Sequence, residues 1–281
     1  MAQRLIPEEE ERRARGTTRN ISGSSRTEFV LTVVAFIAGA VPIFMLLLGG
    51  MAAMMSMGMT MMDTMSKPPD PAMQQPMMKA MHSFMTGYIP YVLVPAIIIL
   101  GVIWGYASAN YPRLSNRIDA GLAAGFIASL GLDVFRLIGV ALGAFPGDMP
   151  TMFGKTITGQ MEIGPGVLLA GYTYHLLLNG TTFGMMYTLL AGKAHWLWGL
   201  AWGLFFELGM MVLPPVPMMA GPFGIHGFWP SLFIASLIAH VVFGVILGLL
   251  AQRWVRDRGT MFSLLTERSP SAVRRRSTIG L

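Results

Sequence analysis

Residues 118–144 read IDAGLAAGFIASLGLDVFRLIGVALGA, an apolar run in which small residues recur and only three positions are charged. Its length suits a membrane span, since a helix needs about 20 apolar residues to cross the hydrocarbon of a bilayer. The whole chain agrees, because 53% of its 281 residues are hydrophobic and only 12% are charged. Soluble domains carry about 25% charged residues. The sequence therefore predicts a membrane protein built from helices.

Five further apolar runs accompany this one, so we predict an all-α bundle of about six transmembrane helices. The predicted spans cover residues 29–48, 88–109, 118–144, 166–191, 196–213 and 230–251. With the N-terminus inside, 16 of the 20 lysine and arginine residues fall on the inner side, and only Lys67, Lys79 and Lys155 fall outside. This positive-inside distribution predicts a multi-pass plasma-membrane protein with both termini in the cytoplasm.

The composition divides the chain into four regions. Residues 1–28 and 252–281 are expected to be basic cytoplasmic tails, the first of them disordered. Residues 29–109 are expected to hold two spans with a methionine-rich outer hairpin at 51–85, and residues 118–251 a four-helix bundle. Arginine runs beside spans are typical of contacts with anionic lipid headgroups. The expected partner is thus the lipid bilayer, with a membrane-protein partner or a homo-oligomer left open, and nucleic acid is not expected.

The four-helix region contains an internal repeat. Residues 121–131 (GLAAGFIASLG) recur as residues 199–209 (GLAWGLFFELG), with six of eleven positions identical. In each copy the next span carries a histidine followed by two glycines: His175, Gly180 and Gly184, then His240, Gly244 and Gly248. We predict a parallel repeat of a two-helix unit, spans 3–4 and 5–6. Glycines four residues apart form a flat face, which favours close helix packing.

Six polar or charged residues fall inside the predicted spans, where such groups are costly and usually face the bundle interior. They are Asp133, Arg136, His175, Asn179, Glu207 and His240. Asp133 and Glu207 follow glycines at intervals of four, so they share the packing faces of their helices. A rise of about 1.5 Å per residue places His175, Glu207 and His240 near the midplane. We predict that the six residues form a polar midplane site.

Three interpretations of this site remain open. The side chains could satisfy one another, His175 with Asn179 or a backbone carbonyl and Asp133 with Arg136. They could instead hold a metal, or ligate haem through His175 and His240. They could also handle an ion, a proton or a small solute through titratable groups. We predict the third function, with a copper- or haem-binding protein and an accessory subunit of a membrane complex as alternatives.

The outer hairpin is unusually rich in methionine, since residues 45–85 contain 14 of the 25 methionines. Thioether sulfur suits Cu(I), so one interpretation is an outer copper site. Its candidate ligands are Met55, Met57, Met59, Met61, Met62 and His82. The alternative is helix packing, because methionine is a good helix former. Helical spacing favours packing for Met77, Met78, Met81 and Met85.

A resemblance adds to this interpretation. The glycines of 121–131 with Asp133, and later His240 with Gly244 and Gly248, resemble uncharacterised prokaryotic membrane proteins of the DUF6789-like kind. The similarity covers 118–251 and implies a small helical inner-membrane protein, without a known activity. The chain contains no Walker loop, nucleophile elbow, zincin motif or Rossmann fingerprint, which favours a protein without enzymatic activity.

Overall fold

The chain is helical through all the residues that the structure describes. A computed structural model describes residues 25–67 and 70–266, and its regular elements there are all helices. The α-helices are α2 Ser25–Ser56, α3 Met61–Ser66, α4 Gln74–Tyr88, α5 Val94–Asn110, α6 Pro112–Ala141, α7 Met149–Thr158, α8 Pro165–Tyr172, α9 Thr181–Ala191, α10 Trp196–Val212, α11 Val216–Ala220, α12 Ser231–Trp254 and α13 Ser263–Thr266. Two π-helical segments are η2 Ile89–Leu93 and η3 Thr173–Gly180, and two 3₁₀ helices are η1 Pro71–Met73 and η4 Pro222–Gly224.

Four helical stretches are long and apolar enough to cross a membrane. Helix α10 and the segment Val216–Gly224, which are separated by a 50° bend, form a fifth if they are counted as one span. The four are Ser25–Ser56, Gln74–Asn110, Pro112–Ala141 and Ser231–Trp254. The chain is therefore an integral multi-pass membrane protein, with four or five candidate spans among the described residues. The expected span 166–191 is helical through α8, η3 and α9. Its polar residues, such as His175 and Asn179, lower its hydropathy, so the sixth span remains a prediction.

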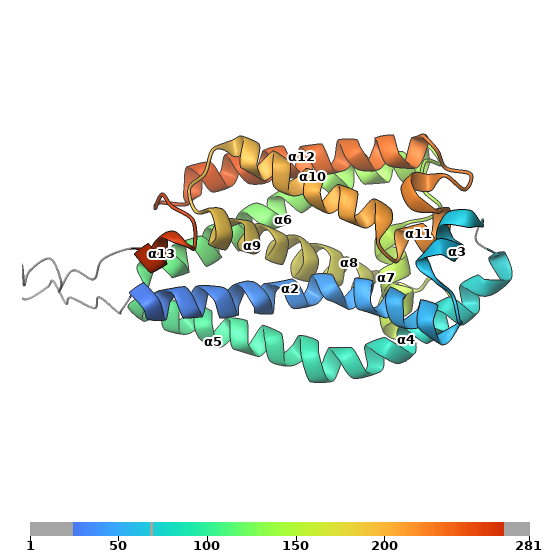
Figure 1. Cartoon of the computed structure of the whole chain (residues 1–281), viewed down its shortest axis with the longest axis horizontal. Coiled ribbons are helices and arrows are strands. Elements are labelled where there is room, and N and C mark those ends of the chain that lie inside the picture. The colour runs from blue at the N-terminus through green and yellow to red at the C-terminus, as the bar shows by residue number, and fades with distance from the viewer. Residues whose placement is uncertain (1–24, 68–69, 267–281) are drawn as a thin grey trace, which may run out of the picture.

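The long helices run side by side along one axis (Figure 1). Helix α6 packs against both α9 and α12, α10 packs against α12, and α2 packs against α4, α5 and α9. Helix α13 contacts α2, so the first and last described residues lie at the same end of the bundle. We call this the terminal end, and we call the opposite end, where α3 and α11 lie, the far end.

Glycines set the closest helix contacts. A Cβ atom built on Gly184 of α9 would lie 2.5 Å from the Cα of Gly125 in α6. One built on Gly203 of α10 would lie 2.6 Å from the carbonyl oxygen of His240 in α12. Side chains larger than glycine would separate these backbones, as expected for small-residue packing in membranes. Both helix pairs marked by the sequence repeat are thus joined through their glycine faces.

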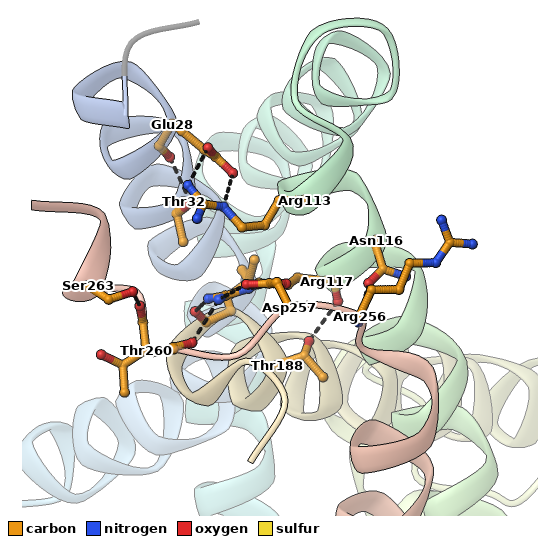
Figure 2. Close-up of polar contacts among 12 residues, drawn as sticks. Glu28, Thr32, Arg113, Asn116, Arg117, Thr188, Arg256, Asp257, Thr260 and Ser263 are labelled. Carbon is orange, nitrogen blue, oxygen red and sulfur yellow. Dashed lines mark hydrogen bonds and ion pairs between the residues drawn. The ribbon is translucent and has the colours of Figure 1, made fainter. Parts of the chain in front are cut away.

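A buried arginine ties the chain together at the terminal end (Figure 2). Arg117 of α6 is 2% exposed, and its Nε lies 3.1 Å from Oδ2 of Asp257. Its Nη1 donates to the carbonyl oxygen of Leu189 at 3.0 Å, and its Nη2 donates to that of Gly259 at 2.8 Å. A guanidinium group offers five donors in a planar fork, so it can hold a carboxylate and two carbonyls together.

Two further contacts hold the same end. Nη2 of Arg113 pairs with the Glu28 carboxylate at 2.8 Å, which joins α6 to α2. The Asn116 amide donates to the Trp254 carbonyl at 3.2 Å and accepts from the Arg256 backbone N–H at 2.9 Å. The two Asn116 bonds fix the start of the segment that follows α12 against α6 (Figure 2).

The inner ends of both tails contain structured residues. Helix α2 begins at Ser25, whereas the first span was expected from residue 29. Within the basic tail expected at 252–281, Val255, Met261 and Leu264 are buried, because their apolar side chains fold back on the bundle. The remaining tail residues, 1–24 and 267–281, lie outside the described part of the chain.

Candidate solute-binding site

The first of two histidine–carboxylate pairs joins α6 to the π-helical segment η3. Nε2 of His175 lies 2.8 Å from Oδ1 of Asp133. The same oxygen accepts a hydrogen bond from Nε of Arg136 at 2.7 Å, one helical turn further along α6. The expected pairing of Asp133 with Arg136 is therefore present. His175 contacts Asp133 rather than Asn179, because the aspartate lies across the helix contact.

The second pair joins α10 to α12. Nδ1 of His240 lies 2.7 Å from Oε2 of Glu207, and the Ser236 hydroxyl donates to the same oxygen at 2.7 Å. Nδ1 also lies 3.0 Å from the Ser236 carbonyl oxygen. Glu207 is 0% exposed. A carboxylate behind an imidazole fixes the orientation of the ring, which aims its other nitrogen in a defined direction.

The Asp133 group extends toward the far end through Arg136 and Asp148. Arg136 forms an ion pair with Asp148, and its Nη2 lies 3.4 Å from the Tyr172 hydroxyl. Asp148 caps α7 by accepting from the Thr151 backbone N–H at 3.0 Å. Burial raises the pKa of Asp148, but the hydrogen bonds from Thr151 and the charge of Arg136 outweigh it and lower the pKa below its usual value.

Both histidines line one cavity of about 370 Å³. Its polar lining comes from Ser129, Arg136, His175, Asn179, Ser236 and His240. The rest of the wall is mainly aromatic and aliphatic, contributed by α2, α6, α7, α9, α10, α12 and the segments before α7 and after α10. A concave, mostly apolar space with a few polar groups is the usual form of a small-molecule site.

Several polar atoms around this cavity have no partner in the described structure. They are Nδ1 of His175, Oδ1 of Asn179 and Oε1 of Glu207; the Tyr187 hydroxyl is a fourth such buried atom elsewhere on α9. A buried polar atom without a hydrogen bond is costly, so it calls for an explanation. Three of the four such atoms belong to the two histidine–carboxylate pairs or to the residue one turn from His175.

The six residues of the predicted midplane site are thus distributed in two ways. Arg136, His175, Asn179 and His240 line the cavity, while Asp133 and Glu207 lie behind the histidines. Sequence reasoning missed Ser236 and Asp148. Their available signals were a serine four residues before His240 and an aspartate just before a helix-starting Met-Pro pair. That these residues form a functional site remains a prediction.

The methionine hairpin mostly packs against its neighbours. Met77, Met81 and Met85 of α4 are buried in one core with Met45 and Met54 of α2, as the packing interpretation expects. Of the candidate copper ligands, Met57 and Met59 pack against this core, Met55 is 78% exposed and Met62 is also exposed. His82 lies 3.0 Å from the Thr156 carbonyl through Nδ1. The side chain of Met61 lies outside the part of the chain that the structure describes.

The polar site and the hairpin were also compared with metal sites built from nitrogen and oxygen ligands. Among the described residues, no three histidine, aspartate or glutamate side chains are grouped to hold a metal ion. Thioether ligation by the exposed methionines remains a prediction, as does ligation of haem by the two histidines.

Comparison with known proteins gives no match. The chain matches no family model, no curated protein and no solved structure. The resemblance to DUF6789-like membrane proteins therefore remains a prediction, and the function has to be argued from the geometry.

Proposed function

We propose that this chain binds a small, largely apolar solute in the cavity between its two helix pairs, as the central step in handling that solute within the membrane. One observation carries the proposal. Two histidines from different helix pairs, each held by its own carboxylate, line one mostly apolar cavity of about 370 Å³. Rigidly oriented polar groups in an apolar pocket are what specific binding of a small molecule requires.

The wall favours a solute over a conducted ion. Ion pathways are lined by rings of carbonyl or charged groups that replace the hydration shell. Here phenylalanine, leucine and proline side chains dominate, and the one charged lining residue, Arg136, is already paired with Asp133 and Asp148. An ion would find few ligands in this space, whereas an apolar solute would remain in contact with the wall.

The proposal includes the finer topology. We infer six spans, with Pro165–Ala191 as the fourth, and a duplicated two-helix unit made of α6 with α8–α9 and of α10 with α12. The matching glycine contacts support the duplication, and each unit contains a histidine–carboxylate pair, although Asp133 and Glu207 stand at different positions of the repeat. A parallel repeat relates its copies by an axis along the membrane normal, with binding at the interface between them. Residues from both proposed units line the cavity.

A cavity-filling variant tests the proposal. Gly209 lines the cavity, and a Cβ built on it meets no atom within 4 Å, so Gly209→Phe should fill the space without a clash. Gly105 of α5 is equally open but does not line the cavity, so Gly105→Phe is the matched control. The probes are two fluorescent aromatic molecules, 2-naphthol and 2-methoxynaphthalene, titrated into the purified full chain in nanodiscs.

We expect saturable binding of at least one probe to the native chain and to Gly105→Phe. Gly209→Phe should weaken it at least tenfold, because the phenyl ring occupies the same volume. Equal binding to all three proteins, or only the partitioning seen in empty nanodiscs, would contradict the proposed function.

A further inference from the structure

We propose that the cavity takes its solute from the surrounding bilayer, through a lateral opening between α2 and α10, and that the solute is the apolar chain of a membrane lipid. This inference rests on the proposed function and specifies the chemical class and the route of its ligand. It follows from where the cavity reaches the surface of the bundle, from the depth of that opening, and from the side chains around it.

The opening lies where α2 and α10 are not packed together. In the described part of the chain, α2 packs against α4, α5 and α9, and α10 packs mainly against α12. Both helices nevertheless line the cavity, α2 with residues between 43 and 47 and α10 with residues between 205 and 210. Helix α9, which also lines it, lies between them in Figure 1. The cavity therefore occupies the space that separates α2 from α10.

Two contacts bound this opening along α2. Toward the terminal end, a Cβ atom built on Gly39 would lie 2.4 Å from the methyl carbon of Met185 in α9. Toward the far end, one built on Gly50 would lie 2.7 Å from the Cβ of Pro214, just after α10. The cavity-lining residues of α2 all lie between these two glycines. The opening is therefore a window of limited height, closed on both sides by helix contacts.

The rim of the window is open to the outside of the bundle. Phe205 is 65% exposed, and Phe44 and Leu213 are also exposed, although all three line the cavity. A Cβ atom built on Gly209, between Phe205 and Leu213, meets no other atom within 4 Å, so this side of α10 borders free space. Side chains that line a cavity and are also exposed mark the place where the cavity reaches the surface.

This rim lies at the depth of the lipid chains. At a rise of about 1.5 Å per residue, Phe205 lies about 2 Å from the midpoint of α10, and Phe44 lies about 5 Å from the midpoint of α2. The hydrocarbon core of a bilayer is about 30 Å thick, so both rings are surrounded by acyl chains and not by water. An apolar window at this depth admits what surrounds it.

The side chains around the window select an apolar chain. The residues that α2 and α10 contribute to the lining are all apolar, and its polar residues lie on α6, η3 and α12 instead. A polar headgroup would lose its hydrogen bonds to water on entering, which costs free energy, whereas a methylene chain exchanges one apolar environment for another. A cavity of about 370 Å³ is near the lower end of the range of ligand sites, roughly 300–1,000 Å³, so it suits part of a chain better than a whole lipid.

A photoreactive lipid tests this route. The probe is a phosphatidylcholine with a diazirine in the middle of one acyl chain, incorporated into nanodiscs that hold the purified full chain. Because a phospholipid with two chains stays in the bilayer, its diazirine can reach the cavity wall only from the side. After irradiation, mass spectrometry of peptides locates the cross-links. We expect cross-links on Ala239 and Phe243, which line the cavity and are buried.

The neighbouring Ile238 supplies an internal reference, because it is exposed at the same depth of α12 and does not line the cavity. Gly209→Phe should lower the yield at Ala239 and Phe243 at least tenfold relative to Ile238, since the added ring blocks the window. Gly105→Phe, the matched control, should leave this ratio at the native value.

The outcomes separate this inference from the proposed function. Naphthalene binding that Gly209→Phe weakens, together with cross-links on Ile238 but none on Ala239 or Phe243, overturns the lipid inference and leaves the proposed function in place. Cross-links on the two buried residues that persist unchanged in Gly209→Phe also overturn it. The absence of both naphthalene binding and buried cross-links overturns the inference and the proposed function together. If Gly209→Phe fails to fold, the native pattern decides alone, because Ile238 shows that the probe has reacted at that depth.

Discussion

The terminal end and the cavity treat buried polar groups in opposite ways. At the terminal end, Arg117 holds a carboxylate and two carbonyls, and Asn116 uses both its donor and its acceptor (Figure 2). Around the cavity, His175, Asn179 and Glu207 each keep one buried atom without a partner. Satisfied groups contribute to folding, whereas unsatisfied buried ones reduce stability. The difference separates a region in which buried polar groups are fully hydrogen-bonded from one in which some buried polar atoms lack a partner.

The largest loss of stability is expected from a substitution of Asp257, at the terminal end. Asp257→Ala leaves the Arg117 guanidinium buried without its counterion, so we expect a loss of about 3–5 kcal/mol in the free energy of unfolding. Unfolding of the purified chain in mixed micelles with increasing SDS measures it. The double variant Arg117→Met with Asp257→Leu should recover most of the loss, since it removes both charges. A single variant within about 0.5 kcal/mol of the native chain would show that Arg117 does not hold this end.

The same substitution, asparagine to leucine, can be made in both regions and compares their stability directly. Asn116→Leu removes bonds to Trp254 and Arg256, so it should cost about 1–3 kcal/mol. Asn179→Leu removes an amide whose oxygen has no partner, so stability should stay within about 0.5 kcal/mol of native or rise. The same SDS titration compares them. An equal loss in both variants would mean that the two regions do not differ.

A smaller loss of stability is expected at Asp148, which precedes the cavity-lining Met149. Asp148→Ala removes the cap of α7 and should cost about 0.5–2 kcal/mol at pH 7. Because folding lowers the pKa of Asp148, its contribution is present above the ordinary aspartate pKa of about 3.9 and is lost as pH falls through the folded value. Thermal unfolding of native and variant chains at pH 7 and pH 3 checks this. Their difference should shrink at pH 3, and a difference that grows would be contrary to the expected sign.

Much of the architecture was predictable because apolar length and glycine spacing are local properties. The run at 29–48 lies within α2, and the run at 230–251 lies within α12 except for its first residue. The glycines of 121–131 and 199–209 mark the faces that pack. Helix α7 was missed, since residues 149–158 are too short to resemble a span. The partner of His175 could not be predicted either. The spacing of residues along one helix does not determine how the neighbouring helix is rotated about its own axis. Only the folded bundle places Asp133 opposite His175.

The π-helical segment at Thr173–Gly180 has a consequence for how the two helix pairs can diverge. His175 stands five residues before Gly180, whereas His240 stands four residues before Gly244. One extra residue in a regular α-helix would rotate everything beyond it by about 100°, which would turn either the histidine or the glycines away from α6. The wider turns of η3 absorb that residue locally, so both contacts survive. Under the proposed duplication, such an insertion would change the pocket wall of one copy and leave its packing face unchanged, so that two halves of similar sequence would differ in specificity.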